Sequence, residues 1–278
     1  MHLFSKKDIK NLLKSHLSSP SKKLGQNFLV DRTAVKKIVS AADLKANDVV
    51  LEIGPGIGTL TQELAKKTRK VIAVEKDRKL VEILGDTLRD FKNVEITYGD
   101  ILKIENSKLI KNLKVVGNLP FYLTAPVIRK FLEMKEAKPH SMVLVVQKEV
   151  GQRICAKPPR MSILAVSVQV YAEAKIISYI SRKSFWPQPE VDAAIIKITP
   201  KIKLERRSLD QINLDLFFKV VKAGFSQPRK QLINNFSKKA DKEKTRNWLI
   251  QNKIKPSQRA ETLSVKDWIN LAKTYKIK

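Results

Sequence analysis

The first 200 residues of this 278-residue chain alternate between short apolar runs and helical segments. The runs are rich in valine and isoleucine, which favour strands, and segments with helical spacing separate the early ones. Strand-like runs are VVLEIG, KVIAVEK, VEITYGD, LKVVGNLP, SMVLVVQ, EAKIISYI and DAAIIKIT. Strands that alternate with helices form βαβ units around a parallel sheet. The last strands follow one another with little helix between them, so we expect an α/β fold whose mostly parallel sheet has an antiparallel end.

The pattern changes near residue 200. Beyond it the strand-like runs stop and four helical segments follow, with Pro228 and Pro256 marking breaks between them. We therefore expect two domains: an α/β domain over residues 1–203, which includes a basic N-terminal segment over residues 1–37, and a small all-helical, basic domain over residues 204–278.

The charge of the chain is concentrated at its two ends. The 55 Lys and Arg residues exceed the 27 Asp and Glu residues by 28, and residues 1–37, 38–200 and 201–278 carry +7, +8 and +13 of this excess. Lys and Arg contacts to phosphates supply much of the affinity for nucleic acids. The basic ends therefore favour a nucleic-acid partner, whereas a general enrichment in lysine would spread the charge evenly.

A glycine-rich loop lies between the first strand-like run and the helix after it. Gly54, Gly56 and Gly58 allow a tight turn and let a ligand approach the backbone without a Cβ in the way. The GxGxG spacing differs from the GxGxxG fingerprint of nicotinamide-dependent enzymes, and no Gly-Lys-Ser/Thr follows as in a Walker-type phosphate loop. Both of those nucleotide-binding classes are therefore poor alternatives.

Two acidic residues end the next two strand-like runs. Glu75, 21 residues after Gly54, can accept both hydroxyls of a ribose, and Asp100 is placed to address an adenine ring. Ligands bind at the carboxyl ends of strands in open α/β sheets. Ribose and adenine recognition without a polyphosphate loop points to S-adenosylmethionine (SAM).

Asn118-Leu119-Pro120-Phe121 ends the fourth run. The exocyclic amine of adenine is a poor nucleophile because its lone pair is delocalised into the ring. The Asn118 side-chain carbonyl and the Leu119 backbone carbonyl can accept its two N–H groups and turn the lone pair toward a methyl donor, so catalysis rests on positioning. Pro120 stiffens the turn, and Phe121 can stack on an extruded base.

With these motifs, the sequence resembles the ribosomal RNA adenine N6-dimethyltransferases. It is most similar to the bacterial branch that dimethylates two adjacent adenines near the 3′ end of small-subunit (16S) rRNA. The resemblance runs from residue 25 to residue 263 and includes GQNFLVD, LEIGPGIGTLT, VEKD, YGDIL, GNLPF, VVQKEVGQR, SFWPQPEVDAA and FSQPRKQLINN. It implies a Rossmann-like class I SAM-dependent methyltransferase fold, a helical domain that binds rRNA, and coupling to the biogenesis of the small subunit.

The resemblance also assigns roles to individual residues. Asn27, Leu29, Gly54, Gly56, Glu75, Asp100 and Asn118 match cofactor-binding positions. Phe121 and Phe185 match aromatic positions expected to sandwich the target adenine, although the family motif usually has Tyr in place of Phe121. Arg229 and Lys230 match phosphate contacts, and the segment 156–162 is shorter than the loop usual there.

Other functions stay open at this point. The chain could modify another rRNA target, as the related macrolide-resistance enzymes of the large subunit or the mitochondrial homologues do, or act mainly by binding during ribosome assembly.

Several features exclude other classes. The three histidines are scattered without metal-ligand spacing, and Cys155 is the single cysteine, which fits a reducing, cytoplasmic setting. The longest apolar runs fall far short of the ~20 residues that cross a bilayer. We expect no metal and no membrane partner, and a monomer that acts on the immature small ribosomal subunit.

Overall fold

The computed structural model of the chain describes residues 3–105, 113–134, 138–201, 212–237 and 241–275. The chain divides into two compact units. The first comprises Met1–Gly151 and Lys175–Pro200, and the second comprises Gln152–Ala174 and Lys201–Lys278.

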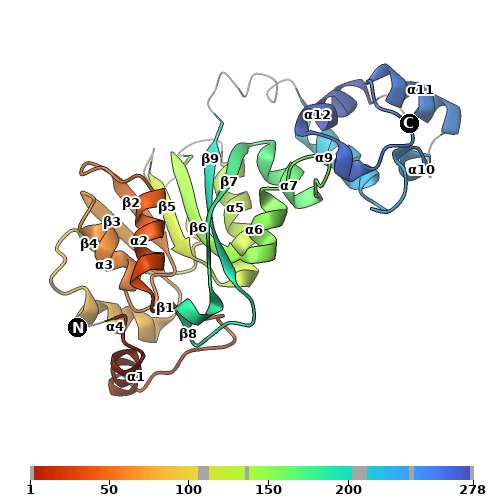
Figure 1. Cartoon of the computed structure of the whole chain (residues 1–278). Coiled ribbons are helices and arrows are strands. Elements are labelled where there is room, and N and C mark those ends of the chain that lie inside the picture. The colour runs from red at the N-terminus through yellow and green to blue at the C-terminus, as the bar shows by residue number, and fades with distance from the viewer. Residues whose placement is uncertain (1–2, 106–112, 135–137, 202–211, 238–240, 276–278) are drawn as a thin grey trace. The chain divides into compact units, whose positions relative to one another are not determined.

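The first unit is built on a seven-stranded sheet with the strand order β4-β3-β2-β5-β6-β9-β7. Its strands are β2 (Val49–Ile53), β3 (Lys70–Glu75), β4 (Val94–Tyr98), β5 (Lys114–Asn118), β6 (Ser141–Gln147), β7 (Ala172–Ile180) and β9 (Ala193–Pro200). Neighbours from β4 to β6 pair in parallel, and β9 pairs antiparallel with β6. The expected mostly parallel sheet with an antiparallel end is thus confirmed, and all seven predicted strands are present (Figure 1).

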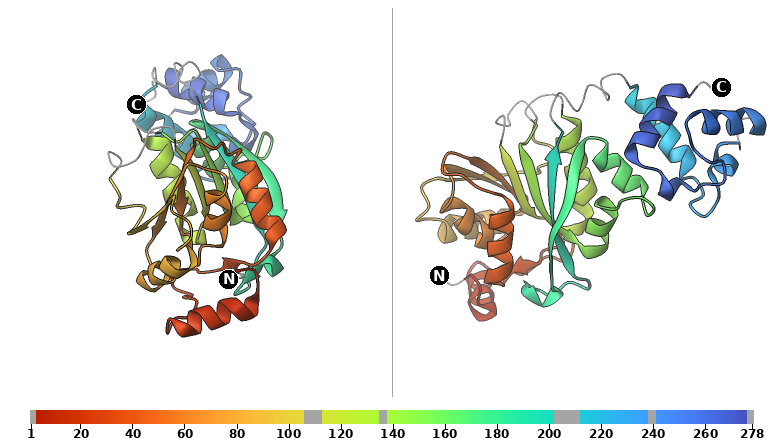
Figure 2. Two further views of the ribbon diagram at one scale, coloured as in Figure 1. Left: turned by 90° about the vertical axis from the view of Figure 1, so that its left-hand side faces the viewer. Right: turned by 45° about the horizontal axis from the view of Figure 1, so that its top comes forward.

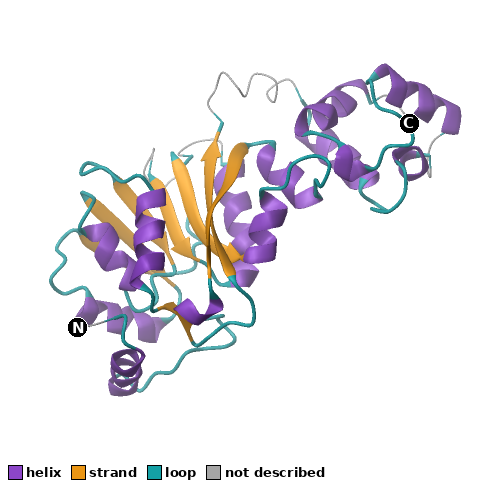
Figure 3. Ribbon diagram, viewed as in Figure 1, coloured by secondary structure: helices purple, strands orange, loops and turns teal. Residues whose placement is uncertain are grey.

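Helices lie on both faces of this sheet (Figures 2 and 3). They include α2 (Arg32–Ala41), α3 (Thr59–Ala65), α4 (Arg78–Thr87), α5 (Thr124–Glu133) and α6 (Lys148–Ile154). The unit also contains α1 (Lys6–Ser15) and the 3-10 turn η2 (Phe121–Leu123). Every residue of β2 is buried, as are the first six of β6. Strands covered on both faces show such continuous apolar runs, which explains why the sequence lacks strand alternation here.

Two smaller features complete the first unit. β1 (Phe28–Leu29) pairs antiparallel with β8 (Phe185–Trp186), which follows the 3-10 turn η3 (Arg182–Ser184). The apolar face of α1 joins Phe28, Ile57 and residues of α4 in one buried cluster. The N-terminal segment is therefore anchored to the glycine loop and to α4.

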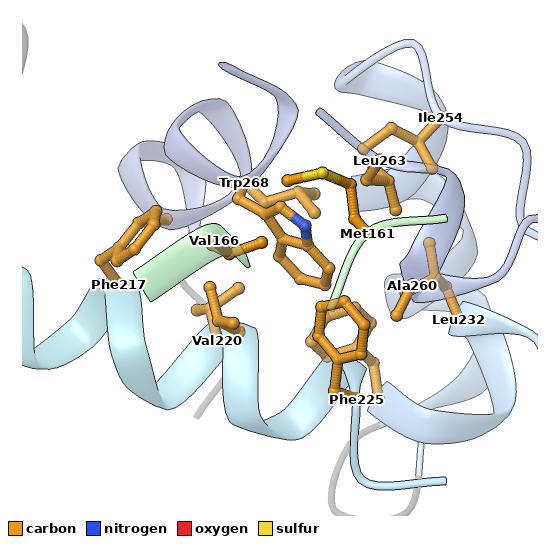
Figure 4. Close-up of a cluster of buried hydrophobic side chains, with 14 of the residues drawn as sticks. Met161, Val166, Phe217, Val220, Phe225, Leu232, Ile254, Ala260, Leu263 and Trp268 are labelled. Atoms are coloured by element: carbon orange, nitrogen blue, oxygen red, sulfur yellow. The ribbon is translucent and has the colours of Figure 1, made fainter. Parts of the chain in front are cut away.

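The described residues of the second unit form mainly helices and the loops between them, apart from residues 172–174 at the start of β7. Its helices are α7 (Ile163–Gln169), α9 (Leu214–Gly224), α10 (Leu232–Phe236), α11 (Lys242–Gln251), η4 (Ala260–Thr262) and α12 (Val265–Thr274). They enclose a hydrophobic core around the fully buried Trp268 (Figure 4). Trp268 stacks on Phe225 with 5.4 Å between the ring centroids.

The second unit also differs from the expected division of the chain. The expected boundary between residues 203 and 204 lies outside the described residues, and the unit takes in residues 152–174 as well. α7 explains this, because Ala165 and Val166 pack into the core around Trp268. The sequence left α7 unassigned because its β-branched residues are poor helix formers. Ser162 starts the helix by accepting a hydrogen bond from the Ala165 N–H at 3.0 Å.

Gly224 is required by the packing of Trp268. A Cβ added at Gly224 would lie 2.3 Å from Trp268 Cη2 and 2.8 Å from Cζ3. Gly224→Ala should therefore lower the free energy of unfolding by about 1–3 kcal/mol through overpacking. The matched control is Gly85→Ala in α4, where an added Cβ meets nothing within 4 Å. Because alanine has the higher helix propensity, this substitution should raise the free energy of unfolding by up to about 1 kcal/mol. Thermal and urea unfolding would measure both, and equal melting temperatures would contradict the prediction.

Candidate active site

A cavity in the first unit opens at the carboxyl ends of β2, β3, β4 and β5. This is the end at which open α/β sheets bind ligands. One wall comes from residues 24–29, which precede α2. The predicted site residues that line the cavity are Asn27, Leu29, Gly54, Gly56, Glu75, Asp100, Asn118 and Pro120. The strand order thus brings together residues that are up to 93 positions apart in the sequence.

The glycine loop connects β2 to α3 by a left-handed path. The φ angles of Gly54, Gly56 and Gly58 are +66°, +62° and +89°, values that residues with a Cβ rarely adopt. A Cβ at Gly56 would also lie 3.1 Å from the Phe28 ring, whereas one at Gly54 would meet nothing within 4 Å. The loop therefore presents bare backbone and open space to the cavity.

The Glu75 carboxylate is buried and held by three backbone N–H groups. Oε2 accepts from Gly56 at 3.2 Å, and Oε1 accepts from Lys76 at 2.8 Å and Asp77 at 2.9 Å. Burial raises the pKa of Glu75, and these three hydrogen bonds oppose that rise. The glycine loop and the acid at the end of β3 are thus one hydrogen-bonded unit.

Asp100 forms the neighbouring acidic group. Its Oδ2 pairs with Lys76 Nζ at 2.8 Å, and its Oδ1 accepts from the Leu102 N–H at 3.0 Å. The hydrogen bond from Lys76 is the main reason that the pKa of Asp100 lies below its usual value, despite the opposing effect of burial. Asp100 is therefore an ionised acceptor whose two oxygens are both fixed.

Asn118 ends β5 and is oriented by the segment that precedes α2. Its Nδ2 donates to the Asn27 carbonyl at 2.9 Å. With the amide nitrogen engaged there, Oδ1 is the atom of this side chain that can accept a hydrogen bond from a ligand. A Cβ on Gly25 would lie 3.2 Å from the Pro120 side chain, so the two motifs are also in close contact.

Gln26 holds the same segment to the end of β3. Its Oε1 accepts from the Ser21 N–H, and its Nε2 donates to Asp77 Oδ2, each at 2.7 Å. Asp77 in turn caps α4 by accepting from the Lys79 N–H at 3.0 Å. The cavity wall formed by residues 24–29 is therefore fixed by polar bonds as well as by the cluster around α1.

A family model described as ribosomal RNA adenine dimethylase matches residues 18–276. The chain belongs to this family. Relatives described as ribosomal RNA small subunit methyltransferase A share its length and much of its sequence. The relative from Clostridioides difficile is 41% identical over 89% of this chain and 88% of its own length. The relative from Dehalococcoides mccartyi is 39% identical over 96% of this chain and 92% of its own length.

Solved structures support the same assignment. The 23S rRNA methyltransferase ErmE is 25% identical, with a TM-score of 0.72 over 88% of this chain and 98% of that one. A dimethyladenosine transferase from Plasmodium falciparum is 26% identical, with a TM-score of 0.72 over 87% of this chain and 95% of that one. The expected Rossmann-like methyltransferase fold is confirmed, and this member of the dimethylase family is an enzyme that methylates rRNA.

The residues after Asn118 are only partly placed as the sequence predicts. The Leu119 side chain is 2% exposed and packs in the hydrophobic core. Phe121 is half-buried in η2 and is not among the residues that line the cavity, whereas Tyr122 lines it and is 52% exposed. The sequence reading missed Tyr122, since two adjacent aromatics after the proline give no indication of which one faces the cavity.

Phe185 does not have the predicted accessibility. Its side chain is 3% exposed and lies in the core cluster with Val145 and Ile195. It is held there because Phe185 pairs with Leu29 across the β1–β8 ladder. With its ring buried, Phe185 has no free face on which a base could stack, so this stacking prediction is not supported. The adjacent Trp186 instead stacks on Phe28, with centroids 6.4 Å apart.

Arg229 and Lys230 lie in the second unit, between α9 and α10, and both are exposed. Their role as phosphate contacts stays a prediction. Among the described residues, no group of three or more His, Cys, Asp or Glu side chains is arranged to hold a metal ion. The described helices also include none that is long and apolar enough to span a membrane.

Glu52 is a second residue that the sequence reading missed. It lies in the middle of the otherwise apolar β2, lines the cavity and is 1% exposed. Its Oε2 has no hydrogen-bond partner among the described residues. Burial, with a contribution from the charge of Glu75, raises the pKa of Glu52 to about 8. The side chain is therefore mostly protonated at neutral pH. In the sequence, the only indication of a special role for Glu52 is that it is a lone acid inside an apolar strand.

The raised pKa of Glu52 predicts a pH-dependent stability. Between the ordinary value of 4.5 and about 8 the folded chain keeps a proton that the unfolded chain has lost. This contribution to stability is complete below pH 4.5 and falls as pH rises, by at most about 1.4 kcal/mol per pH unit. Glu52→Gln should remove it, so that the variant is the more stable protein at pH 9 and similar at pH 5. Urea unfolding across this range would measure the difference, and parallel curves for the two proteins would contradict the pKa assignment.

Proposed function

We propose that this protein transfers methyl groups from SAM to N6 of two adjacent adenines near the 3′ end of small-subunit rRNA. The observation that carries the proposal is that the glycine loop, Glu75, Asp100 and Asn118 line one and the same cavity. The target is supported by the relatives described as small subunit methyltransferase A, which match nearly the whole chain.

The cavity has the features that SAM requires. Glu75 offers carboxylate oxygens to the ribose hydroxyls of SAM, and Asp100 offers an ionised acceptor to the amine of the adenine of SAM. The backbone at Gly54 and Gly56, which carries no side chains, leaves room for the amino-acid end of SAM. A Cβ at Gly56 would lie only 3.1 Å from the Phe28 ring. Asn27 and Leu29 close the opposite wall. SAM supplies the methyl group when it is bound.

Asn118 positions the target amine. Because its Nδ2 is engaged by Asn27, its Oδ1 accepts one N–H of the adenine amine, and the Leu119 backbone carbonyl accepts the other. These two bonds turn the nitrogen lone pair toward the donor. The proton of the alkylated nitrogen is acidic, so no strong base is required. Phe121, or the cavity-lining Tyr122, provides the ring on which the extruded base stacks.

The RNA-binding surface includes the basic ends of the chain. Residues 1–37 and 201–278 together carry +20 of the net charge, and Arg229 and Lys230 are exposed for phosphate contacts. We infer that the protein works as a monomer on the immature small subunit in the cytoplasm.

Large-subunit rRNA is the less favoured target. The 23S rRNA methyltransferase ErmE is 25% identical, whereas the small-subunit relatives are 39–41% identical. A protein that acts mainly by binding during ribosome assembly is also less favoured, because binding alone requires neither the cofactor cavity nor the Asn118 motif.

Asn118→Ala should reduce methyl transfer by roughly 100-fold or more, the scale seen when one positioned hydrogen-bonding group is lost. Cofactor affinity should weaken less, because Glu75 and Asp100 remain. Single-turnover transfer and calorimetric titration with SAM would separate the two effects. The control is Asn47→Ala, an exposed asparagine before β2 at the opposite end of the strands, which should behave as wild type. Retained dimethylation in Asn118→Ala would refute the assigned role.

The target is tested by incubating the protein with methyl-labelled SAM and immature small subunits, followed by mapping of the modified bases. We expect dimethylation of two adjacent adenines near the 3′ end. Label on large-subunit RNA would favour the resistance-type function. If no label is transferred but the assembly defect of a deletion strain is rescued by both wild type and Asn118→Ala, the binding function would be favoured.

A further inference from the structure

The register of β3 and β4 places a lysine beside the acid proposed to recognise adenine. Glu75 pairs with Tyr98 in parallel, so the residues that follow the two strands, Lys76 and Asp100, leave the sheet side by side. Lys76 lines the cavity, and its Nζ lies 2.8 Å from Asp100 Oδ2. Its backbone N–H also donates to Glu75 Oε1. Lys76 therefore connects the two acids assigned to the nucleoside of the cofactor.

We propose that Lys76 is a positioning residue for adenine recognition: it holds the Asp100 carboxylate ionised and in one orientation, ready to accept the adenine amine. The inference rests on the proposed binding of SAM in this cavity. The Asp100 side chain is only 16% exposed, whereas that of Lys76 is 53% exposed. A carboxylate buried to this degree is disfavoured without a cationic partner.

The hydrogen-bond donors around Asp100 explain why its carboxyl group should be ionised. An ionised carboxylate is an acceptor at both oxygens, and each oxygen can accept more than one hydrogen bond. Asp100 can therefore keep Lys76 on Oδ2 and the Leu102 N–H on Oδ1 while it accepts the adenine amine. Protonation would turn one of the two oxygens into an O–H donor, so Asp100 would have fewer acceptor positions for these three N–H donors.

Other cations near Asp100 are placed for different roles. Lys130 Nζ donates to the Ile104 carbonyl at 2.6 Å and thereby holds the loop after β4. Lys103 donates its backbone N–H to the Asp100 carbonyl at 2.8 Å, and its charge helps to lower the pKa of the Asp100 carboxyl. The charge of Asp100 also acts on Lys130. The direct ion pair to Asp100 comes from Lys76.

The test compares two ligands, S-adenosylhomocysteine and its analogue with purine in place of adenine, which lacks the exocyclic amine. In calorimetric titrations of the full chain, Lys76→Met should weaken S-adenosylhomocysteine binding roughly fivefold, the scale of a partly exposed ion pair. The analogue should lose less than about twofold, because the amine through which Asp100 acts is absent. Lys76→Arg should keep wild-type affinity for both.

Lys66→Met is the matched control, since Lys66 is also 53% exposed and pairs with an acid, Glu63, at 2.6 Å. It should bind both ligands as wild type does. Equal weakening of both ligands by Lys76→Met would indicate a structural role and overturn the inference, as would unchanged or tighter binding. If wild type itself binds neither ligand, the proposed function fails, which distinguishes that failure from this one.

Discussion

The hydrogen bond from the Gly56 N–H to the Glu75 carboxylate joins the two elements on which the cavity depends. It connects the turn after β2 to the end of β3, so the left-handed glycine loop and the buried acid fix each other's position. Two more N–H groups, from Lys76 and Asp77, turn the backbone after β3 around the same carboxylate. A buried acid is costly unless it is satisfied in this way. An acid held by three donors is already oriented before a ligand arrives, which lowers the ordering cost of binding.

The segment before α2 extends this arrangement to the reaction centre. Gln26 attaches it to Asp77, beside Glu75, and the Asn27 carbonyl attaches it to Asn118. The same segment thus contacts both the proposed nucleoside end of the cavity and the residue proposed to position the amine. Because it also continues into the α1 cluster, burial of apolar side chains helps to keep these polar contacts in place.

Much of the fold could be predicted from the sequence because buried parallel strands leave a strong pattern of valine and isoleucine. Glu75, Asp100 and Asn118 could be assigned to one site because Glu75 and Asn118 end β3 and β5, and Asp100 comes two residues after β4. α7 was missed because its residues favour strands, and its helical state is set by a cap at Ser162 and by packing against the core of the second unit. That packing depends on α9 and α12, which lie far away in the sequence.

The side chains that the sequence misassigned or missed are those whose surroundings depend on strand order and register. Phe185 is buried because β8 pairs with β1, a two-residue ladder with no recognisable pattern. Lys76 reads as an ordinary surface lysine until the pairing of β3 with β4 places it on Asp100. Glu52 acquires its raised pKa because β2 is enclosed on both faces and lies near Glu75. In each case the residue type was visible in the sequence, but its electrostatic or packing environment is created by partners on neighbouring strands. Motifs therefore identify the groups that form this cavity, whereas the protonation and orientation of those groups follow from the sheet.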